Sequence, residues 1–334
     1  MTFEDRVAGV AGLGFNERQA RFLVTVACHA GVCMVRQYCA FCGIRYGQIA
    51  RDFFAGLTAR RLATTFECAH RRARIYHLRH RALYDSIGEP HSRLRKPVPL
   101  PRAVERLMIL DTVLADASLR WLATEREKLE HFSLTFGSAL RREEFPKLVF
   151  GRGEAVTVRY FPDRLPIGLD TAGGSYVFLY LVTRPAPLDF RAFLQRHAEL
   201  FRALPSWCVR LLLPRHLEKA QSAHRAAFQQ ELASPLRPAV VEDLQWFFEE
   251  RQRLPVLGDA RDSRDPQRFE RLSHAFAAPR YRRLYRAWRS DGPRVLDSLT
   301  SGVLADALAR GSGRLETTVL ARQYLHLSSL VGTA

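Results

Sequence analysis

Apolar residues near the start of the chain recur at the spacing of an amphipathic helix. Asn16 can cap a helix, and Gln19 follows three positions later, as in a capping box. The apolar positions that follow lie at i, i+3, i+4 and i+7: Ala20, Leu23, Val24 and Ala27. Gly31 is expected to end this first helix.

Two further helices are predicted after the first. A short helix from about Met34 to Gly43 has apolar positions at helical spacing: Val35, Tyr38, Cys39 and Cys42. A third helix, about residues 46–61, gathers apolar side chains on one face: Ile49, Phe53, Phe54 and Leu57. Its polar positions are expected to face solvent: Gln48, Arg51 and Asp52.

A basic hairpin follows the third helix. Residues 63–68 and 74–78 are β-prone runs, and the polar, basic segment 69–73 separates them. Three helices followed by a hairpin predict a winged helix-turn-helix domain over residues 1–88.

The remaining chain divides by composition into four parts. Residues 89–101 hold four prolines and predict a linker. A helical region is expected over 102–146, a small α/β domain over 147–233 and a helical C-terminal region over 234–334. The predicted fold class is therefore α+β and mainly helical.

The α/β domain is expected to alternate strands and helices. Its predicted strands are residues 156–160, 176–182 and 207–213. Its predicted helices are residues 190–204 and 217–232.

The net charge of +17 favours a polyanionic partner, with nucleic acid ahead of an anionic membrane surface. A GC-rich coding bias would produce a similar excess without such a partner. The chain has four lysines, so 51 − 4 = 47 of its basic residues are arginine, as that bias would give.

Arginines gather in the predicted winged helix. From Arg36 to Arg81 the sequence has ten arginines and only two acidic residues, Asp52 and Glu67, a net charge of 10 − 2 = +8. In a helix-turn-helix the second helix of the pair enters the major groove, where arginine reads guanine and glutamine reads adenine. The predicted DNA-binding residues are Arg36, Arg45, Tyr46, Gln48 and Arg51 in the helices, with Arg71, Arg72 and Arg74 on the hairpin.

The cysteines raise the possibility of a zinc site. Six are present, and the pair Cys39 and Cys42 suggests tetrahedral zinc with Cys28 and Cys33, or with Cys68 and His70. The alternative is that Cys39 and Cys42 are buried in a helix as small hydrophobic residues. This alternative predicts reduced thiols, no metal and no cofactor.

Two aspartates raise the possibility of a nuclease site. Asp163 and Asp170 resemble the start of a metal-dependent nuclease site, which also needs a carboxylate and usually a lysine on the next strand. The predicted strand 176–182 has neither. Asp163 is therefore expected to be a turn residue, and no catalytic residue is predicted.

Aromatic residues and arginines alternate over residues 280–289. In a single-strand binder the aromatics would stack on bases while arginine follows phosphate. In an ordinary amphipathic helix Tyr281, Leu284 and Trp288 would be buried and the arginines solvated.

No signal peptide and no membrane-length apolar run is evident, so we expect a cytoplasmic protein without a membrane partner or a small-molecule substrate. Double-stranded DNA is the expected partner. A homodimer is an open alternative to a monomer.

With these elements in order, the chain resembles the replication-relaxation family of winged-helix proteins, which plasmids and integrative conjugative elements carry. The likeness covers about residues 12–232. It rests on the winged-helix block, on the segment Trp121 to Glu127, on Pro162-Asp163 before a hairpin, and on the helix-strand-helix that follows.

The resemblance implies a role on a mobile genetic element, in replication, mobilisation or transcriptional regulation. It also implies a second domain with the element order of restriction endonucleases. Because the acidic residues that such members place on the hairpin's second strand are absent here, that domain is expected to be degenerate.

Three classes of function follow: a sequence-specific DNA-binding protein, a metal-dependent nuclease, and a protein-binding adaptor in a DNA-transfer complex. The first is preferred because of the arginines. A fragment ending near Arg95 is expected to keep DNA binding, since the proline-rich segment would separate it from the rest.

Overall fold

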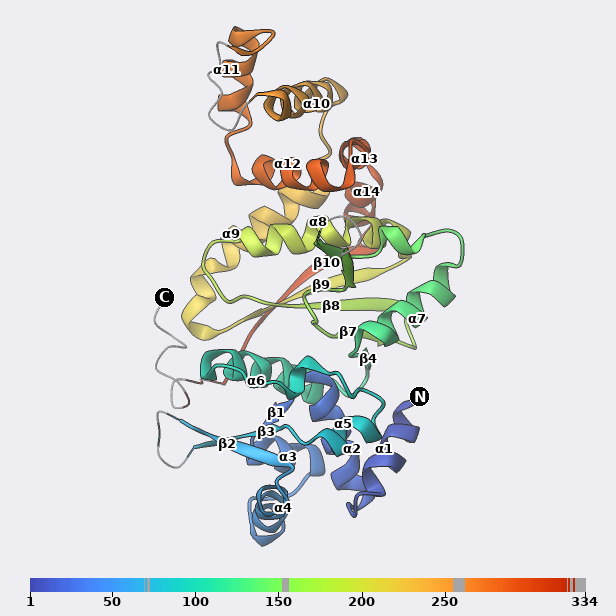
Figure 1. The fold of residues 1–334 in the computed structure, drawn as a ribbon, viewed down its shortest axis with the longest axis vertical. Coiled ribbons are helices and arrows are strands. Elements are labelled where there is room, and N and C mark those ends of the chain that lie inside the picture. The colour runs from blue at the N-terminus through green and yellow to red at the C-terminus, as the bar shows by residue number, and fades with distance from the viewer. Residues whose placement is uncertain are drawn as a thin grey trace.

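The computed structural model describes residues 1–68, 70, 73–151, 156–254, 262–322, 324 and 327. The fold is α+β and mainly helical, as predicted. A unit built from the first 90 or so residues lies at one end, a five-stranded sheet lies in the middle, and a cap of helices lies at the other end (Figure 1).

The N-terminal unit contains three predicted helices and a hairpin, in the predicted order. Asn16 caps α2 through a reciprocal capping box with Gln19, as its sequence indicates. A helix before the first predicted one, a two-residue strand and a short helix after the hairpin were not predicted. The elements are α1 Phe3–Ala11, α2 Glu17–His29, β1 Val32–Cys33, α3 Val35–Cys42, α4 Gln48–Ala59, β2 Ala63–Glu67, β3 Arg74–Leu78 and α5 Arg81–Ser86. The three strands pair antiparallel in the order β1-β3-β2.

The prediction of a separating linker over residues 89–101 is wrong. This segment forms the short helix η1 (Arg93–Arg95) and packs on the N-terminal unit. The backbone oxygen of Leu94 lies 2.8 Å from His77 Nε2. Leu94 also lies so close to Gly31 (φ +69°) that a Cβ there would be 2.6 Å from its oxygen.

Helix α6 (Leu100–Ala115) connects the N-terminal unit to the sheet. It lies between the two (Figure 1), and seven of its side chains are buried. One hydrophobic core therefore runs from α2 and α3 through α6 to one face of the sheet, where it includes Val177, Leu179 and Cys208.

The five strands of the sheet are β4 Arg120–Leu122, β7 Ile167–Asp170, β8 Ser175–Leu181, β9 Trp207–Leu213 and β10 Gly313–Val319, and they lie in the order β10-β9-β8-β7-β4. Strands β8, β9 and β10 pair parallel to one another. Strand β7 pairs antiparallel with β8, and β4 pairs antiparallel with β7. Alternate residues of β8 face the N-terminal core or a second core under α8. Both faces are thus covered, which explains why β8 and β9 are almost continuously apolar. The other elements of this region are α7 Glu125–Phe136, η2 Arg142–Glu144, β5 Lys147–Phe150, β6 Thr157–Tyr160, α8 Leu188–Ala203, η4 Arg215–Ala220, α9 Gln221–Phe228 and η5 Gln229–Ala233.

The predicted strand 156–160 is present as β6 and pairs with β5 in a separate two-stranded ribbon. Two predictions for this region need correction. Residues around Leu122, expected in a helix, form β4. The C-terminal region is not wholly helical, because β10 (Gly313–Val319) returns to the sheet beside β9.

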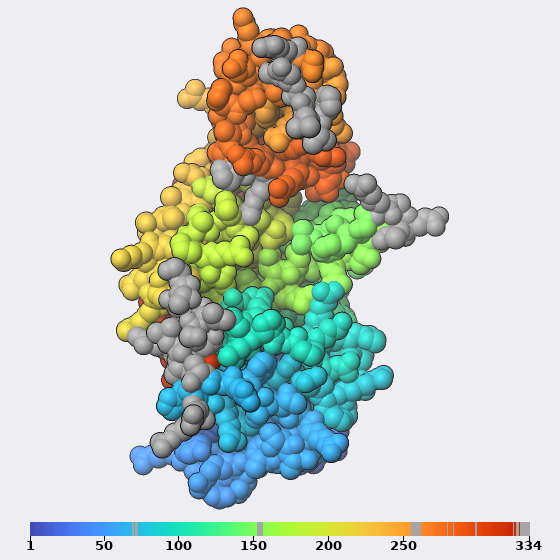
Figure 2. Space-filling model, turned by 60° about the vertical axis from the view of Figure 1, so that its left-hand side comes forward, coloured from blue at the N-terminus to red at the C-terminus, as the bar shows by residue number. Residues whose placement is uncertain are grey.

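The helical cap has a core of its own, centred on Phe247, Phe248 and Trp288. In the space-filling view the cap, in orange, lies at the top of the molecule, above the green and yellow middle of the chain (Figure 2). Its elements are α10 Pro238–Arg253, α11 Pro266–Ala275, α12 Pro279–Asp291, α13 Arg294–Asp297 and η7 Ser298–Thr300, and α14 Val303–Ala309 then leads back to the sheet. Across the described residues, no helix has the length and apolar character needed to span a bilayer.

Candidate nucleic-acid interface

Helix α4 presents one polar and one buried face. Ala50, Phe53, Phe54 and Leu57 are buried against the rest of the N-terminal unit. Gly43, in the left-handed conformation at φ 63°, ends α3 and turns the chain toward α4. The helix lies at the end of the molecule farthest from the cap (Figure 1).

The predicted contact residues at the start of α4 are exposed and close in sequence: Arg45, Tyr46, Gln48 and Arg51. Ile49, which was predicted to be buried, is 68% exposed, as is Tyr46. Ala50 takes the buried position instead, since it lies three and four residues before Phe53 and Phe54 and so shares their face. The tip of α4 therefore offers cations, an amide and two apolar side chains to a partner.

Three polar side chains on this face bond to one another. Gln48 Nε2 donates to Asp52 Oδ1 at 2.5 Å, and Arg51 Nη2 donates to Gln48 Oε1 at 2.9 Å. These exposed bonds lie within one turn of helix. Because they are exposed, each contributes little and can be exchanged for bonds to a base edge.

Arg36 does not belong to this surface, and its prediction as a DNA contact is wrong. Its guanidinium forms two hydrogen bonds of 2.7 Å with the carboxylate of Asp111 on α6. It also lies 5.7 Å from the ring centroid of Tyr324. A bidentate ion pair of this kind holds α3 on α6 instead of leaving a cation for phosphate.

The hairpin supplies one described cation. Arg74 is exposed at the start of β3 and pairs in register with Glu67 of β2. The other two predicted hairpin contacts, Arg71 and Arg72, lie outside the described residues.

The cysteines considered for zinc are packed mostly inside the N-terminal core. Cys28, Cys33 and Cys39 are buried, while Cys42 and Cys68 are partly exposed. Burial raises the pKa of the Cys28 thiol to about 12, which disfavours the thiolate that a metal needs. In the part of the chain that the structure describes, no cluster of three His, Cys, Asp or Glu residues could hold a metal ion.

The aspartates considered for a nuclease site have structural partners. Asp163 lies in a turn, as predicted, and its Oδ1 accepts a 2.6 Å hydrogen bond from Arg196 Nη2. Asp170 Oδ1 accepts the backbone N–H groups of Ala172 and Gly173 in the turn between β7 and β8.

A buried lysine near Asp163 was not predicted. Lys128 of α7 is 1% exposed, and its Nζ donates to the Leu165 carbonyl at 2.8 Å. Burial lowers the pKa of its ammonium to about 8. The negative charge of Asp163 acts to raise the pKa of this ammonium. The nuclease pattern places its lysine on the next strand, whereas this one comes from a helix earlier in the chain.

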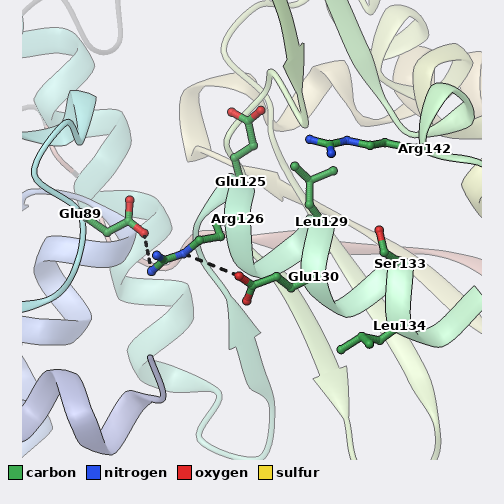
Figure 3. Close-up of a pocket in the computed structure, with 8 residues that line it drawn as sticks. All are labelled: Glu89, Glu125, Arg126, Leu129, Glu130, Ser133, Leu134 and Arg142. Atoms are coloured by element: carbon green, nitrogen blue, oxygen red, sulfur yellow. Dashed lines mark ion pairs between the residues drawn. The ribbon is translucent and has the colours of Figure 1, made fainter. Parts of the chain in front are cut away.

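An open groove of about 700 Å³ lies beside α7 (Figure 3). Arg126 bridges Glu89 of the N-terminal unit, at 3.5 Å, and Glu130, at 4.0 Å. With Glu125 and Arg142 the lining holds three acids and two arginines. This balance does not suit a polyanion, so the groove is not part of the candidate interface.

The burial of α12 side chains distinguishes the two interpretations of residues 280–289, a single-strand binder and an ordinary amphipathic helix. Leu284 and Trp288 are 4% and 6% exposed, and Tyr281 packs against the same core. The helix is therefore an ordinary amphipathic one, and its buried aromatics are not available for stacking on bases.

No family model, no curated protein and no solved structure matches the chain. Its function is therefore inferred from the geometry of α4 and its surroundings.

Proposed function

We propose that the chain is a sequence-specific double-stranded DNA-binding protein, in which residues 1–88 act as a winged helix-turn-helix. The observation that carries this proposal is the exposed start of α4. Gln48 and Arg51 project from a helix whose opposite face is buried, and the exposed Arg45 lies in the turn just before it. The order of elements and the β1-β3-β2 sheet support this proposal, since α3 and α4 then form the helix-turn-helix and β2-β3 the wing.

In the proposed complex α4 enters the major groove. Arg45 and Arg51 donate to guanine O6 and N7, Gln48 pairs with adenine, and Ile49 contacts a thymine methyl group. Arg74 on the hairpin contacts phosphate or the minor groove. The resemblance to the replication-relaxation family would place this activity on a plasmid or conjugative element.

The test is binding of the full chain to a duplex selected from a random pool. Alanine at Arg45 or Arg51 is expected to cost about 1–3 kcal/mol and to relax the preference at particular base pairs. Alanine at Arg74 is expected to weaken binding to every sequence alike and to reduce the salt slope by about one.

R225A, an exposed arginine of α9, provides the matched control and should change neither quantity. If R45A and R51A bind and discriminate like R225A, α4 is not a reading helix. The adaptor class would then take precedence, with Tyr46 and Ile49 as its contact residues.

A further inference from the structure

One face of α12 carries three arginines that form no ion pair with the residues that the structure describes. Arg282, Arg286 and Arg289 lie at i, i+4 and i+7, so they share one stripe of the helix. All three side chains are exposed, and none forms an ion pair with another described residue. Like charges at this spacing destabilise a helix unless an anion lies near them.

Four other arginines of the cap form ion pairs, whereas the exposed Arg271 and Arg294, like the stripe, form none with another described residue. The ion pairs are Arg253 and Arg264 with Glu250, Arg268 with Asp243, and Arg280 with Glu231. Carboxylates are thus present in this part of the fold, yet the stripe on α12 has none among the described residues. A fourth cation adjoins it: the guanidinium of Arg251 lies 4.6 Å from the ring centroid of Tyr285, which follows Arg282 by one helical turn.

The buried face of α12 decides what kind of anion the stripe can bind. Leu284 and Trp288 lie in the core of the cap, and Trp288 Nε1 donates to Gln245 Oε1 at 3.1 Å. These aromatic and apolar groups are therefore not free to stack on the bases of a single strand. They are equally unable to enter a lipid surface, which an interfacial helix requires.

We propose that Arg282, Arg286 and Arg289 bind the phosphate backbone of duplex DNA, as a second contact surface distinct from α4. Seven residues of helix rise about 10 Å. That length corresponds to about three steps between successive phosphates of one strand, at about 3.4 Å each along the duplex axis, so the stripe can span about four phosphates. Because α12 and α4 lie toward opposite ends of the molecule (Figure 1), the two surfaces contact different stretches of DNA. The proposal does not depend on whether α4 reads sequence.

The test compares two triple variants of the full chain on a long labelled duplex of mixed sequence. R282A/R286A/R289A removes the stripe. The matched control, R215A/R225A/R310A, removes the same charge from exposed arginines elsewhere on the chain. The slope of log Kd against log salt should fall by about two to three for the stripe variant and by less than about one for the control. Equal slopes for the two variants would overturn the proposal.

Two further measurements ask whether charge carries the binding and whether duplex DNA is the anion. R282K/R286K/R289K keeps the charge and should bind like the unaltered chain; if it binds as weakly as the alanine variant, phosphate contact by charge is wrong. Phosphatidylserine vesicles test a membrane surface instead. Vesicle binding that the alanine variant loses, together with an unchanged duplex slope, would also overturn the proposal.

Sequence preference distinguishes this proposal from the one made for α4. The stripe variant should weaken binding to all duplexes equally and keep the preference, whereas R45A should lose it. Failure of R45A to change preference would contradict the reading role of α4 alone, because the slope measured for the stripe is a separate result.

Discussion

Glu250, near the end of α10, is a fully buried carboxylate. Its Oε1 accepts hydrogen bonds from Arg253 Nη2 at 2.6 Å and from the Arg264 backbone N–H at 2.8 Å. Its Oε2 accepts from Arg264 Nε at 2.7 Å. The hydrogen bond from Arg253 is the main cause that lowers the pKa of Glu250 to about 2.

We expect E250Q to lower the free energy of unfolding by about 1–3 kcal/mol at pH 7, because charge-assisted hydrogen bonds are lost. The folded-state pKa lies below the unfolded value, so this contribution is present above the unfolded carboxyl pKa of about 4.3 and is lost as the pH falls toward 2. Urea unfolding at pH 7 and pH 3 measures both effects. E249Q, at an exposed neighbour, is the control, and an equal loss in the two variants would contradict the prediction.

Lys128 makes the free energy of unfolding rise with pH, as Glu250 does, but in an alkaline window and because burial of its charged form is unfavourable. Its folded-state pKa of about 8 lies below the unfolded value, so between that pH and about 10.4 the unfolded chain binds more protons. The free energy of unfolding should therefore rise with pH across this window, and below it the cost of burying the ammonium is fully present.

K128M removes the titrating group at similar volume and should flatten this rise relative to the unaltered chain. The exposed Lys219 offers a control, K219M, which should keep the rise. Chemical unfolding at pH 8 and pH 10 gives the comparison, and parallel curves for K128M and the unaltered chain would argue against a buried ammonium.

At the scale of elements, the last strand of the sheet depends on one glycine. A Cβ on Gly313 at the start of β10 would lie 2.6 Å from Cζ2 of Trp207, its partner in register on β9. Trp207 is 0% exposed and stacks on Phe201 at a centroid distance of 4.4 Å, so the ring has no room to move.

G313A should therefore lower the free energy of unfolding by about 1–3 kcal/mol through overpacking. G56A provides the contrast: it lies inside α4 with no atom within 4 Å of the added Cβ, and should raise stability by about 0.5–1 kcal/mol. Thermal unfolding of both variants tests the pair. A G313A chain as stable as the unaltered one would mean that β10 can shift away from Trp207.

At the scale of the whole molecule, the N-terminal unit and the sheet share one core. Besides the Arg36 pair, Gln37 Nε2 donates to Asp111 Oδ1 at 2.8 Å and to the Leu107 carbonyl at 3.2 Å, both on α6. Tyr324, beyond β10, is buried in the same core and hydrogen bonds with Asp111.

A fragment of residues 1–95 should consequently fold poorly, in contrast to the expectation drawn from its proline-rich end. It lacks α6, which covers apolar surface on α2 and α3, and the lost burial is worth about 25 cal/mol per Å². Amide hydrogen exchange in α2 and α4 is the measurement, with the full chain as reference. Strong protection in the fragment would show that the N-terminal unit is independent after all.

Local rules in the sequence determined the elements themselves. Three local features act over only a few residues: the capping box at Asn16, the left-handed turn at Gly43 and the apolar spacing of α2. They can therefore be recognised from the sequence without knowledge of the fold. The same holds for the exposure of Gln48 and Arg51 on α4, which follows from helical periodicity. The sequence alone also shows the excess of arginine, which favours a polyanionic partner.

Only the tertiary structure decided which residues are free to act. Arg36 is paired because Asp111, 75 positions away, lies beside it, and no local pattern contains that distance. The exposure of Ile49 and the return of β10 to the sheet also depend on distant neighbours. On α12 the sequence shows arginines and aromatics alternating, but packing alone buries the aromatics and leaves Arg282, Arg286 and Arg289 without a counter-charge among the described residues. Contacts between distant segments form only when the chain folds as a whole, so only the folded structure shows which side chains are paired, buried or exposed.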